Sequence, residues 1–97
     1  MPMDALIETH KQGLQALAHQ YGLGELLLFG SMARGDATGQ SDVDLLVDHS
    51  AHLTGFQLGA LQMDAQDLLG RRVDVVTINS IHPLMRDRVL LEAVSLL

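Results

Sequence analysis

The sequence of 97 residues contains no cysteine and no tryptophan, and aromatic residues make up only 3% of it. Without cysteine, disulfide bonds and thiolate metal sites are excluded. No apolar run reaches the roughly 18 residues that a membrane span requires. No basic stretch precedes an apolar one near the start, so we expect no signal peptide. These absences favour a cytoplasmic protein whose core is built from aliphatic side chains and methionine.

Basic residues are scarce as well. Six Lys and Arg stand against twelve Asp and Glu, which gives a formal net charge of -6. Because non-specific nucleic-acid binding uses Lys and Arg to neutralise phosphates, this balance argues against a DNA-binding module. The hydrophobic share of 47% is too high for a disordered chain. The length fits one small domain, so we expect residues 1–97 to fold as a unit.

Hydrophobic periodicity and glycine placement predict an α+β fold with the order α-β-β-α-β-α, a small mixed sheet with helices packed on one side. Apolar residues near the helical period predict helices at 3–21, 54–69 and 83–93. Short apolar runs predict strands at 25–29, 42–48 and 72–77. The small and polar residues between the first two strands predict a turn at 30–41, with one helical turn at 32–35.

Several residues mark the expected helix ends and faces. Thr54 and Gln57 form a capping box, Gly70 suits a left-handed C-terminal cap, and Pro83 suits a first helical turn. In the last helix we expect Met85, Val89 and Ala93 to face the core. We expect the last helix and the apolar segment 94–97 to form a docking surface.

Asp42 and Asp44 lie two positions apart on an expected strand, so both side chains point to one face. Their Cα atoms are then roughly 7 Å apart, and two carboxylates this close disfavour joint ionisation. A cation between them removes that cost, and magnesium commonly combines one or two carboxylates with substrate phosphates. The pattern predicts a site for magnesium and a triphosphate.

Asp74 lies among β-branched residues in the third expected strand, where an unpaired carboxylate is costly. If this strand lies beside the second, Asp74 faces Asp42 and Asp44. Three carboxylates can hold two magnesium ions about 3.5–4 Å apart, the arrangement used for in-line phosphoryl displacement. Asp74 is then well placed to take a proton from an acceptor hydroxyl.

Gly30 and Ser31 directly follow the first expected strand. Glycine lets the backbone approach a phosphate closely, and the serine hydroxyl with nearby amides can donate to phosphate oxygens. Arg34 is the only basic residue in this segment, and it could stabilise charge on a leaving pyrophosphate.

Each of these residues also has a purely structural interpretation. Asp42 and Asp44 could form a solvated strand end, Asp74 could be an edge-strand residue paired with a neighbouring arginine, and Arg34 could be a surface residue. Asp36 and Asp48 suit a turn and a strand end. The five histidines include no compact ligand set, so we expect surface or capping roles for them: His10, His19, His49, His52 and His82.

Taken together, Gly30-Ser31, ten intervening residues, Asp42-x-Asp44 and the later strand aspartate at 74 resemble the signature of the DNA polymerase β-like nucleotidyltransferase superfamily. The longer strings at 29–48 and 71–94 resemble its minimal branch, the MNT domains encoded beside HEPN-domain toxins. The resemblance covers nearly the whole chain.

The resemblance implies an antitoxin that binds a helical HEPN partner in a hetero-oligomer and transfers AMP from ATP, with magnesium, to a tyrosine hydroxyl of that partner. By carry-over, Gly30 and Ser31 contact the triphosphate, while Asp42, Asp44 and Asp74 bind metal and carry catalysis. An alternative is an antitoxin that neutralises its partner by binding alone. A third hypothesis, transfer to a small molecule such as an aminoglycoside, is weakened because these 97 residues hold no added helical acceptor-binding domain.

Overall fold

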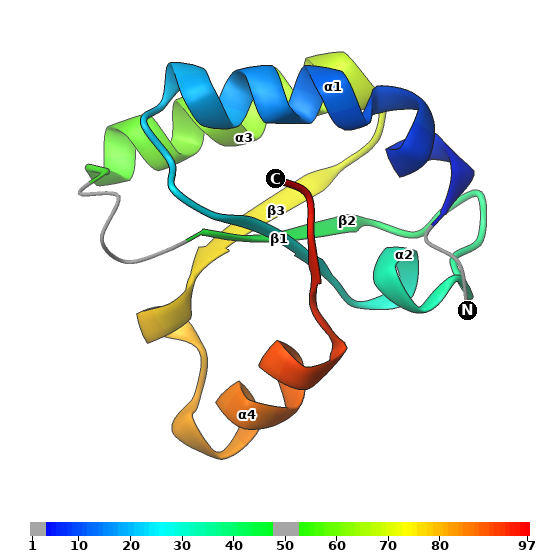
Figure 1. Ribbon diagram of the computed structural model, residues 1–97, viewed down its shortest axis with the longest axis vertical. Coiled ribbons are helices and arrows are strands. Elements are labelled where there is room, and N and C mark those ends of the chain that lie inside the picture. Colours follow the sequence, from blue (N-terminus) through cyan, green and yellow to red (C-terminus); the bar gives the residue numbers. More distant parts are fainter. Residues whose placement is uncertain (1–3, 48–52) are drawn as a thin grey trace.

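The computed structural model describes residues 4–47 and 53–97 and forms one four-stranded sheet with helices around it (Figure 1). The predicted strand at 42–48 and helix at 3–21 extend into residues 48 and 3, which lie outside the described residues. The elements in chain order are α1 (Ala5–Gln20), β1 (Leu26–Phe29), α2 (Ser31–Arg34), β2 (Val43–Val47), α3 (Gly55–Leu69), β3 (Val73–Thr77), the 3-10 helix η2 (Ile78–Ser80), α4 (Pro83–Glu92) and β4 (Val94–Ser95).

The sheet is mixed, with the strand order β3-β2-β1-β4. β1 runs antiparallel to β2 and to β4, whereas β2 and β3 are parallel. Parallel neighbours need a crossover connection, and α3 supplies it between β2 and β3. This confirms the expected small mixed sheet of an α+β fold and adds an edge strand, β4, that the sequence pattern did not predict.

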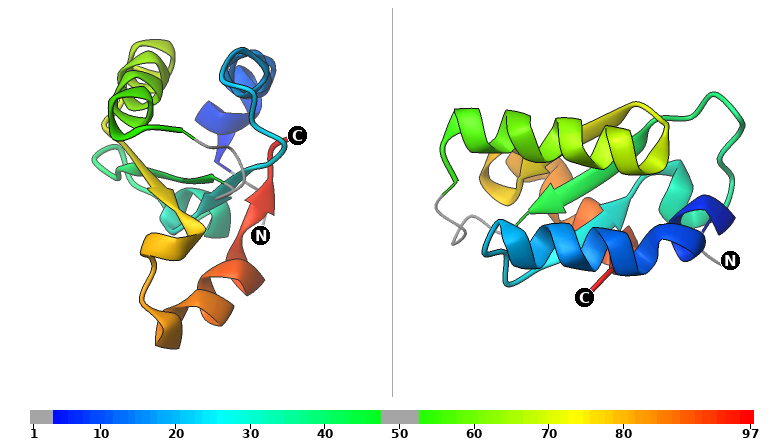
Figure 2. Two further views of the ribbon diagram at one scale, coloured as in Figure 1. Left: turned by 90° about the vertical axis from the view of Figure 1, so that its left-hand side faces the viewer. Right: turned by 90° about the horizontal axis from the view of Figure 1, so that it is seen from above.

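α1 and α3 lie side by side on one face of the sheet, and α4 lies on the opposite side (Figure 2). Between the two helices and the sheet is a dry aliphatic core, since no polar or charged residue among the described ones is buried. The side chains with at most 1% of their surface exposed are Ile7, Leu14, Ala18, Leu26, Leu28, Met32, Val43, Leu45, Leu46, Val47, Leu61, Ala65, Val73 and Leu96.

Local capping chemistry ends the helices as predicted. The Thr54 side chain accepts from the Gln57 amide at 3.1 Å, and the Gln57 side chain accepts from the Thr54 amide at 2.9 Å. Gly70 follows α3 in the left-handed conformation, with φ of 66°. His82 caps α4 by accepting from the Leu84 amide, directly before Pro83. The capping box, the glycine cap and the capping histidine are therefore confirmed.

The remaining histidines fit the expected minor roles where they are described. His19 is exposed, and the His10 ring lies 2.9 Å from the Leu6 carbonyl oxygen. His49 and His52, together with Asp48, lie outside the described residues. None of the described helices combines the length and the apolar character needed to cross a membrane.

Two expectations about the C-terminal third are wrong. α4 buries none of its residues: Met85 is 56% exposed and Val89 is only half-buried, so this helix does not face the core. Of the expected docking surface, α4 does expose apolar side chains, but segment 94–97 is not a free surface, because β4 pairs with β1 and Leu96 is fully buried. Leu96, which follows α4, is buried in the core, whereas no residue of α4 itself is buried.

Candidate active site

The parallel pairing of β2 with β3 sets two of the predicted aspartates opposite one another. Asp44 and Asp74 are Cα partners in this register, and both are half-buried. Asp42 immediately precedes β2 and, by strand alternation, belongs to the same face as Asp44. The crossover through α3 thus brings together three residues that are up to thirty-two positions apart in the sequence.

The charges in this group disfavour an ionised Asp44. Burial raises the pKa of the Asp44 carboxyl, and the neighbouring charges of Asp74 and Asp42 raise this pKa further. Arg34 acts in the opposite direction and lowers the pKa, but its effect is the smallest. Because a cation would relieve both the burial cost and the repulsion, the donor set has the chemistry of a divalent-cation site built from oxygen ligands.

The side chains of Asp42, Asp44 and Asp74 nevertheless do not converge on one point. Within residues 4–47 and 53–97, no three Asp, Glu or His side chains converge closely enough to hold a metal ion. Asp42 instead lies 3.9 Å from Arg72, in an ion pair whose members are 43% and 75% exposed. Exposed pairs of this kind contribute little to stability, so this contact does not fix the position of Asp42.

Gly30 brings the backbone of the following turn against Asp44. The last residue of β1, Phe29, is the Cα partner of Asp44, and Gly30 follows with φ of 76° and ψ of -156°. An added Cβ at Gly30 would stand 2.5 Å from the Asp44 carboxylate oxygen Oδ2. Both the backbone conformation and the close approach therefore require glycine at this position.

Ser31 opens the short helix α2, which Gly30 caps and Gly35 ends in the left-handed conformation. The Gly30 carbonyl accepts from the Ala33 and Arg34 amides, each at 3.1 Å. Met32 is fully buried and anchors the turn to the core. The predicted helical turn at 32–35 is thus present one residue earlier, at 31–34, and Ser31 is half-buried directly after Gly30.

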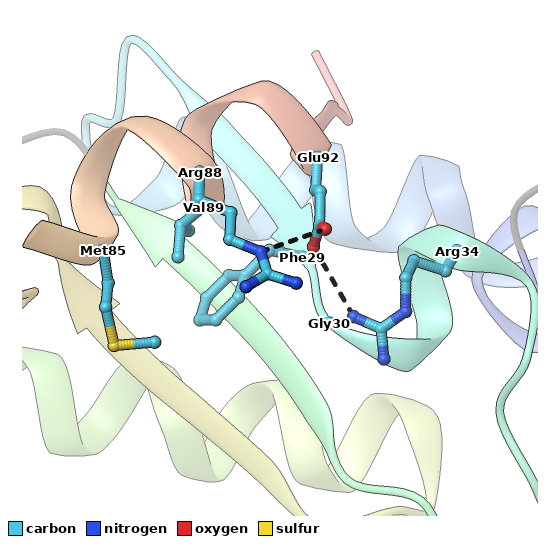
Figure 3. A pocket seen from close by; sticks show the side chains of 7 residues that line it. All are labelled: Phe29, Gly30, Arg34, Met85, Arg88, Val89 and Glu92. Atoms are coloured by element: carbon cyan, nitrogen blue, oxygen red, sulfur yellow. Dashed lines mark ion pairs between the residues drawn. The ribbon is translucent and has the colours of Figure 1, made fainter.

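Arg34 projects from α2 into an acidic environment. Its Nε donates to Asp36 at 3.1 Å, and its Nη1 lies 3.5 Å from the Glu92 carboxylate of α4. Asp36, and to a smaller degree Glu92, raise the pKa of the Arg34 guanidinium. Figure 3 shows this side chain at the mouth of a pocket that also includes Gly30 and residues of α4. Arg34 is therefore beside the site, and the turn residue Asp36 orients it.

Sequence reasoning missed a second arginine that shapes the site. Arg71, after α3, donates through Nη2 to the carbonyls of Thr38 and Ser41. These contacts fasten the loop before Asp42 to the start of β3. No local pattern in the sequence indicates these contacts, because donor and acceptors are thirty or more positions apart.

Comparison with known proteins places this geometry in a family. Residues 10–96 match the family described as Nucleotidyltransferase domain. The chain is 41% identical over 91 residues to MJ0435 of Methanocaldococcus jannaschii, named as a candidate protein adenylyltransferase; the match covers 94% of this chain and 98% of the relative. It is also 34% identical over 92 residues to the protein adenylyltransferase MntA of Thermococcus cleftensis, covering 95% and 90%.

Solved structures with a similar fold agree with this family match. A structure described as a candidate minimal nucleotidyltransferase superposes with a TM-score of 0.83 at 34% identity, covering 95% of both chains. The fold also matches a chain from a complex of a tri-AMPylated Shewanella oneidensis HEPN toxin with an MNT antitoxin, with a TM-score of 0.72 and 20% identity over 93% of this chain and 71% of that one. At that identity the match speaks for the fold alone. With the family match over residues 10–96, these findings show that the chain belongs to the nucleotidyltransferase domain family.

Proposed function

We propose that this protein transfers AMP from ATP to a tyrosine hydroxyl of a partner HEPN-domain toxin and thereby neutralises it. The observation that carries the proposal is the register of Asp44 against Asp74, with Gly30 packed on the Asp44 carboxylate. A relative is named as a protein adenylyltransferase. A structure of the same fold pairs an MNT antitoxin with an AMPylated HEPN toxin. Both support the same activity for this chain.

In this proposal Asp42, Asp44 and Asp74 would hold magnesium, two ions in the full complement, once their side chains turn from the spread arrangement described above toward one another. The fit is supported by the raised pKa of Asp44, since burial and two adjacent carboxylates make a cation the natural neighbour. Bound magnesium supplies positive charge that neutralises the triphosphate and lowers the pKa of the acceptor hydroxyl. The protein's own contribution is to keep the three oxygen donors on one face of a rigid sheet.

Gly30 and Ser31 receive the triphosphate. Gly30 places the backbone of this turn against Asp44, glycine lets a backbone approach a phosphate closely, and the half-buried Ser31 hydroxyl is available as a donor. Arg34 is exposed and bound only by weak surface pairs, so it can turn its guanidinium to the departing pyrophosphate.

The proposed transfer step joins AMP to the acceptor and releases pyrophosphate. The acceptor oxygen forms a bond to the α-phosphorus of ATP while its proton passes to the Asp74 carboxylate. The bond between that phosphorus and the bridging oxygen to the β-phosphate breaks, and pyrophosphate leaves with the bonding pair. AMP remains on the acceptor as a phosphodiester. Asp74 has this role because the register sets it directly opposite Asp44, so its carboxylate lies beside the proposed metal site.

A protein acceptor also suits the surface of α4. Leu84 and Leu91 are each 87% exposed, and Met85 is 56% exposed. Exposed apolar side chains on one helix are typical of protein interfaces. Contact through α4 would present a partner next to the pocket that includes Gly30 and Arg34. The same surface supports the alternative proposal, an antitoxin that acts by binding alone.

Intact-mass spectrometry of the neighbouring gene's product, incubated with this protein, ATP and magnesium, tests the proposal. We expect the product to gain mass in steps of one AMP, and we expect the gain to vanish in EDTA. Asp42→Asn/Asp44→Asn should abolish the gain but leave the complex intact. Asp67→Asn, on the exposed side of α3, is the matched control and should transfer normally.

The two proposals predict different outcomes. If the mass of the neighbouring gene's product stays unchanged while the two proteins still co-purify and that product is inactive, this protein acts by binding alone. If magnesium has no effect on a real mass gain, the assigned role of the three aspartates is wrong.

A further inference from the structure

A pocket of about 410 Å³ lies between the turn after β1 and helix α4 (Figure 3). One part of its wall is apolar and the other part is charged. Gly30 lies in the wall, so the pocket is continuous with the turn that the proposed function assigns to the triphosphate. The remaining lining residues are Phe29, Met85 and Val89 on the apolar part and Arg34, Arg88 and Glu92 on the charged part.

Glu92 is shared between the two arginines. One of its carboxylate oxygens lies 3.5 Å from Arg34 Nη1, and the other lies 3.9 Å from Arg88 Nε. Figure 3 shows Glu92 between the two arginine side chains, with an ion pair to each. Arg34 comes from α2, whereas Arg88 and Glu92 are one turn apart on α4, so the three residues connect the turn with the helix.

These pairs are long and solvated, which makes them exchangeable. The side chains of Arg34, Arg88 and Glu92 are 47%, 82% and 37% exposed. Ion pairs with such exposure contribute between zero and about 1 kcal/mol, so they do little for the fold. A ligand with several negative charges can replace one carboxylate at low cost, and arginine binds phosphate in two-pronged geometry.

We propose that Arg88 joins Arg34 in binding the polyphosphate of the nucleotide, and that Glu92 holds both guanidinium groups until the polyphosphate displaces it. The inference rests on the proposed function for the identity of the ligand as a nucleoside triphosphate. Glu92 is a positioning residue in this account. Glu92 also makes the pocket selective for ligands with several negative charges, because such a ligand must carry more charge than one carboxylate to displace Glu92 from both arginines.

Isothermal titration in magnesium buffer, with ATP and with inorganic tripolyphosphate as probes, tests this inference. Arg88→Gln removes one charge-assisted contact, so we expect binding of both probes to weaken about tenfold. Glu92→Gln removes the competitor, so we expect both probes to bind several-fold more tightly. Lys11→Gln and Glu8→Gln change the same charges on α1, across the sheet, and should bind like the wild type.

The outcomes separate this inference from the proposed function. If the wild type binds ATP but Arg88→Gln behaves like Lys11→Gln, or Glu92→Gln like Glu8→Gln, the inference is overturned and the function stands. An effect on ATP without an effect on tripolyphosphate also overturns it, since the arginine would then contact the nucleoside. Absence of any ATP binding by the wild type overturns both. Matching thermal unfolding of the variants excludes misfolding as the cause.

Discussion

Gly30 combines two constraints in one residue, a backbone conformation and a contact. Its φ of 76° and ψ of -156° lie in a region that is essentially restricted to glycine, and its missing side chain leaves room for the Asp44 carboxylate. We therefore expect Gly30→Ala to lower the free energy of unfolding by about 2 kcal/mol or more. Urea denaturation measures this change, and titration with ATP should show weakened binding.

Two other glycines separate the causes. Gly22 also has a positive φ, 69°, but an added Cβ there meets nothing within 4 Å, so Gly22→Ala should show the strain alone, about 1 kcal/mol. Gly24 has open space and no left-handed φ, and Gly24→Ala should be nearly neutral. If Gly30→Ala unfolds no more easily than Gly22→Ala, the contact with Asp44 is not a constraint.

Ionised Asp44 lowers the free energy of unfolding of the protein. Its pKa is raised in the folded protein, so its contribution to stability is full below the ordinary carboxyl pKa and is lost as pH rises through the raised value. At neutral pH we therefore expect Asp44→Asn to be more stable than the wild type without metal. Because Asp44 is only half-buried, solvent screening limits the gain to below about 1 kcal/mol.

Denaturation at several pH values checks this prediction. The gain should shrink as pH falls through the raised pKa of Asp44 and vanish near the ordinary carboxyl pKa, where the folded carboxyl is already protonated. Magnesium should stabilise the wild type and leave Asp44→Asn unchanged. Asp67→Asn should show neither effect, and a gain that is constant across pH would rule out titration of Asp44 as its source.

At the scale of elements, the outer edge of β3 is covered by side chains of α3. The Val73 amide donates to Gln66 Oε1 at 3.2 Å, and the Val75 amide donates to Gln62 Oε1 at 3.3 Å. β3 is the last strand on its side of the sheet, and uncovered edge amides are a template for pairing with another chain. The two glutamines thus protect the strand that carries Asp74.

Replacing both, Gln62→Ala with Gln66→Ala, should lower the free energy of unfolding by about 1 kcal/mol for each lost hydrogen bond. We also expect concentration-dependent self-association, measured by size-exclusion chromatography with light scattering. Gln12→Ala, an exposed glutamine on α1, is the control and should remain unchanged. A double variant that stays monomeric would mean that the edge needs no cover.

The elements that sequence predicted well are those specified by neighbours in the chain. Thr54 with Gln57, and Gly70, act within one helical turn of themselves, so their roles could be predicted from the sequence. The spacing of Asp42 and Asp44 was equally local. β4 is only two residues long, and a run that short has no periodicity to detect.

The contacts that sequence could not predict are long-range. Met85 was expected in the core because α4 has apolar residues at helical spacing, yet tertiary packing leaves it exposed. The sequence pattern predicted no role for Glu92 or Arg88. Their place beside Gly30 follows only from the path by which α4 returns the chain to β1.

At the scale of the whole molecule, the C-terminal segment ties distant parts together. The Leu96 amide donates to the Leu26 carbonyl at 2.8 Å, and the Leu96 carbonyl accepts from the Gln15 side chain at 2.8 Å. The Leu96 side chain is fully buried. One residue thus joins α1, β1 and the end of the chain.

Leu96→Ala should therefore lower the free energy of unfolding by roughly 2–4 kcal/mol, a large share of the stability of a domain this small. Leu97→Ala, at a side chain that is 49% exposed, should cost far less. Thermal and urea denaturation compare the two. Equal effects of both variants would show that the segment is a surface tail after all.

The parallel pairing of β2 with β3 has a consequence for when the site exists. Its two facing carboxylates, Asp44 and Asp74, are carried by strands that α3 separates in the sequence, so the pair forms only when β3 has joined β2. A nascent or partly unfolded chain is then without activity, because an open β3 removes Asp74 from its partner. Activity therefore requires that β3 is paired with β2. A cation bound between Asp44 and Asp74 would stabilise this pairing by mass action.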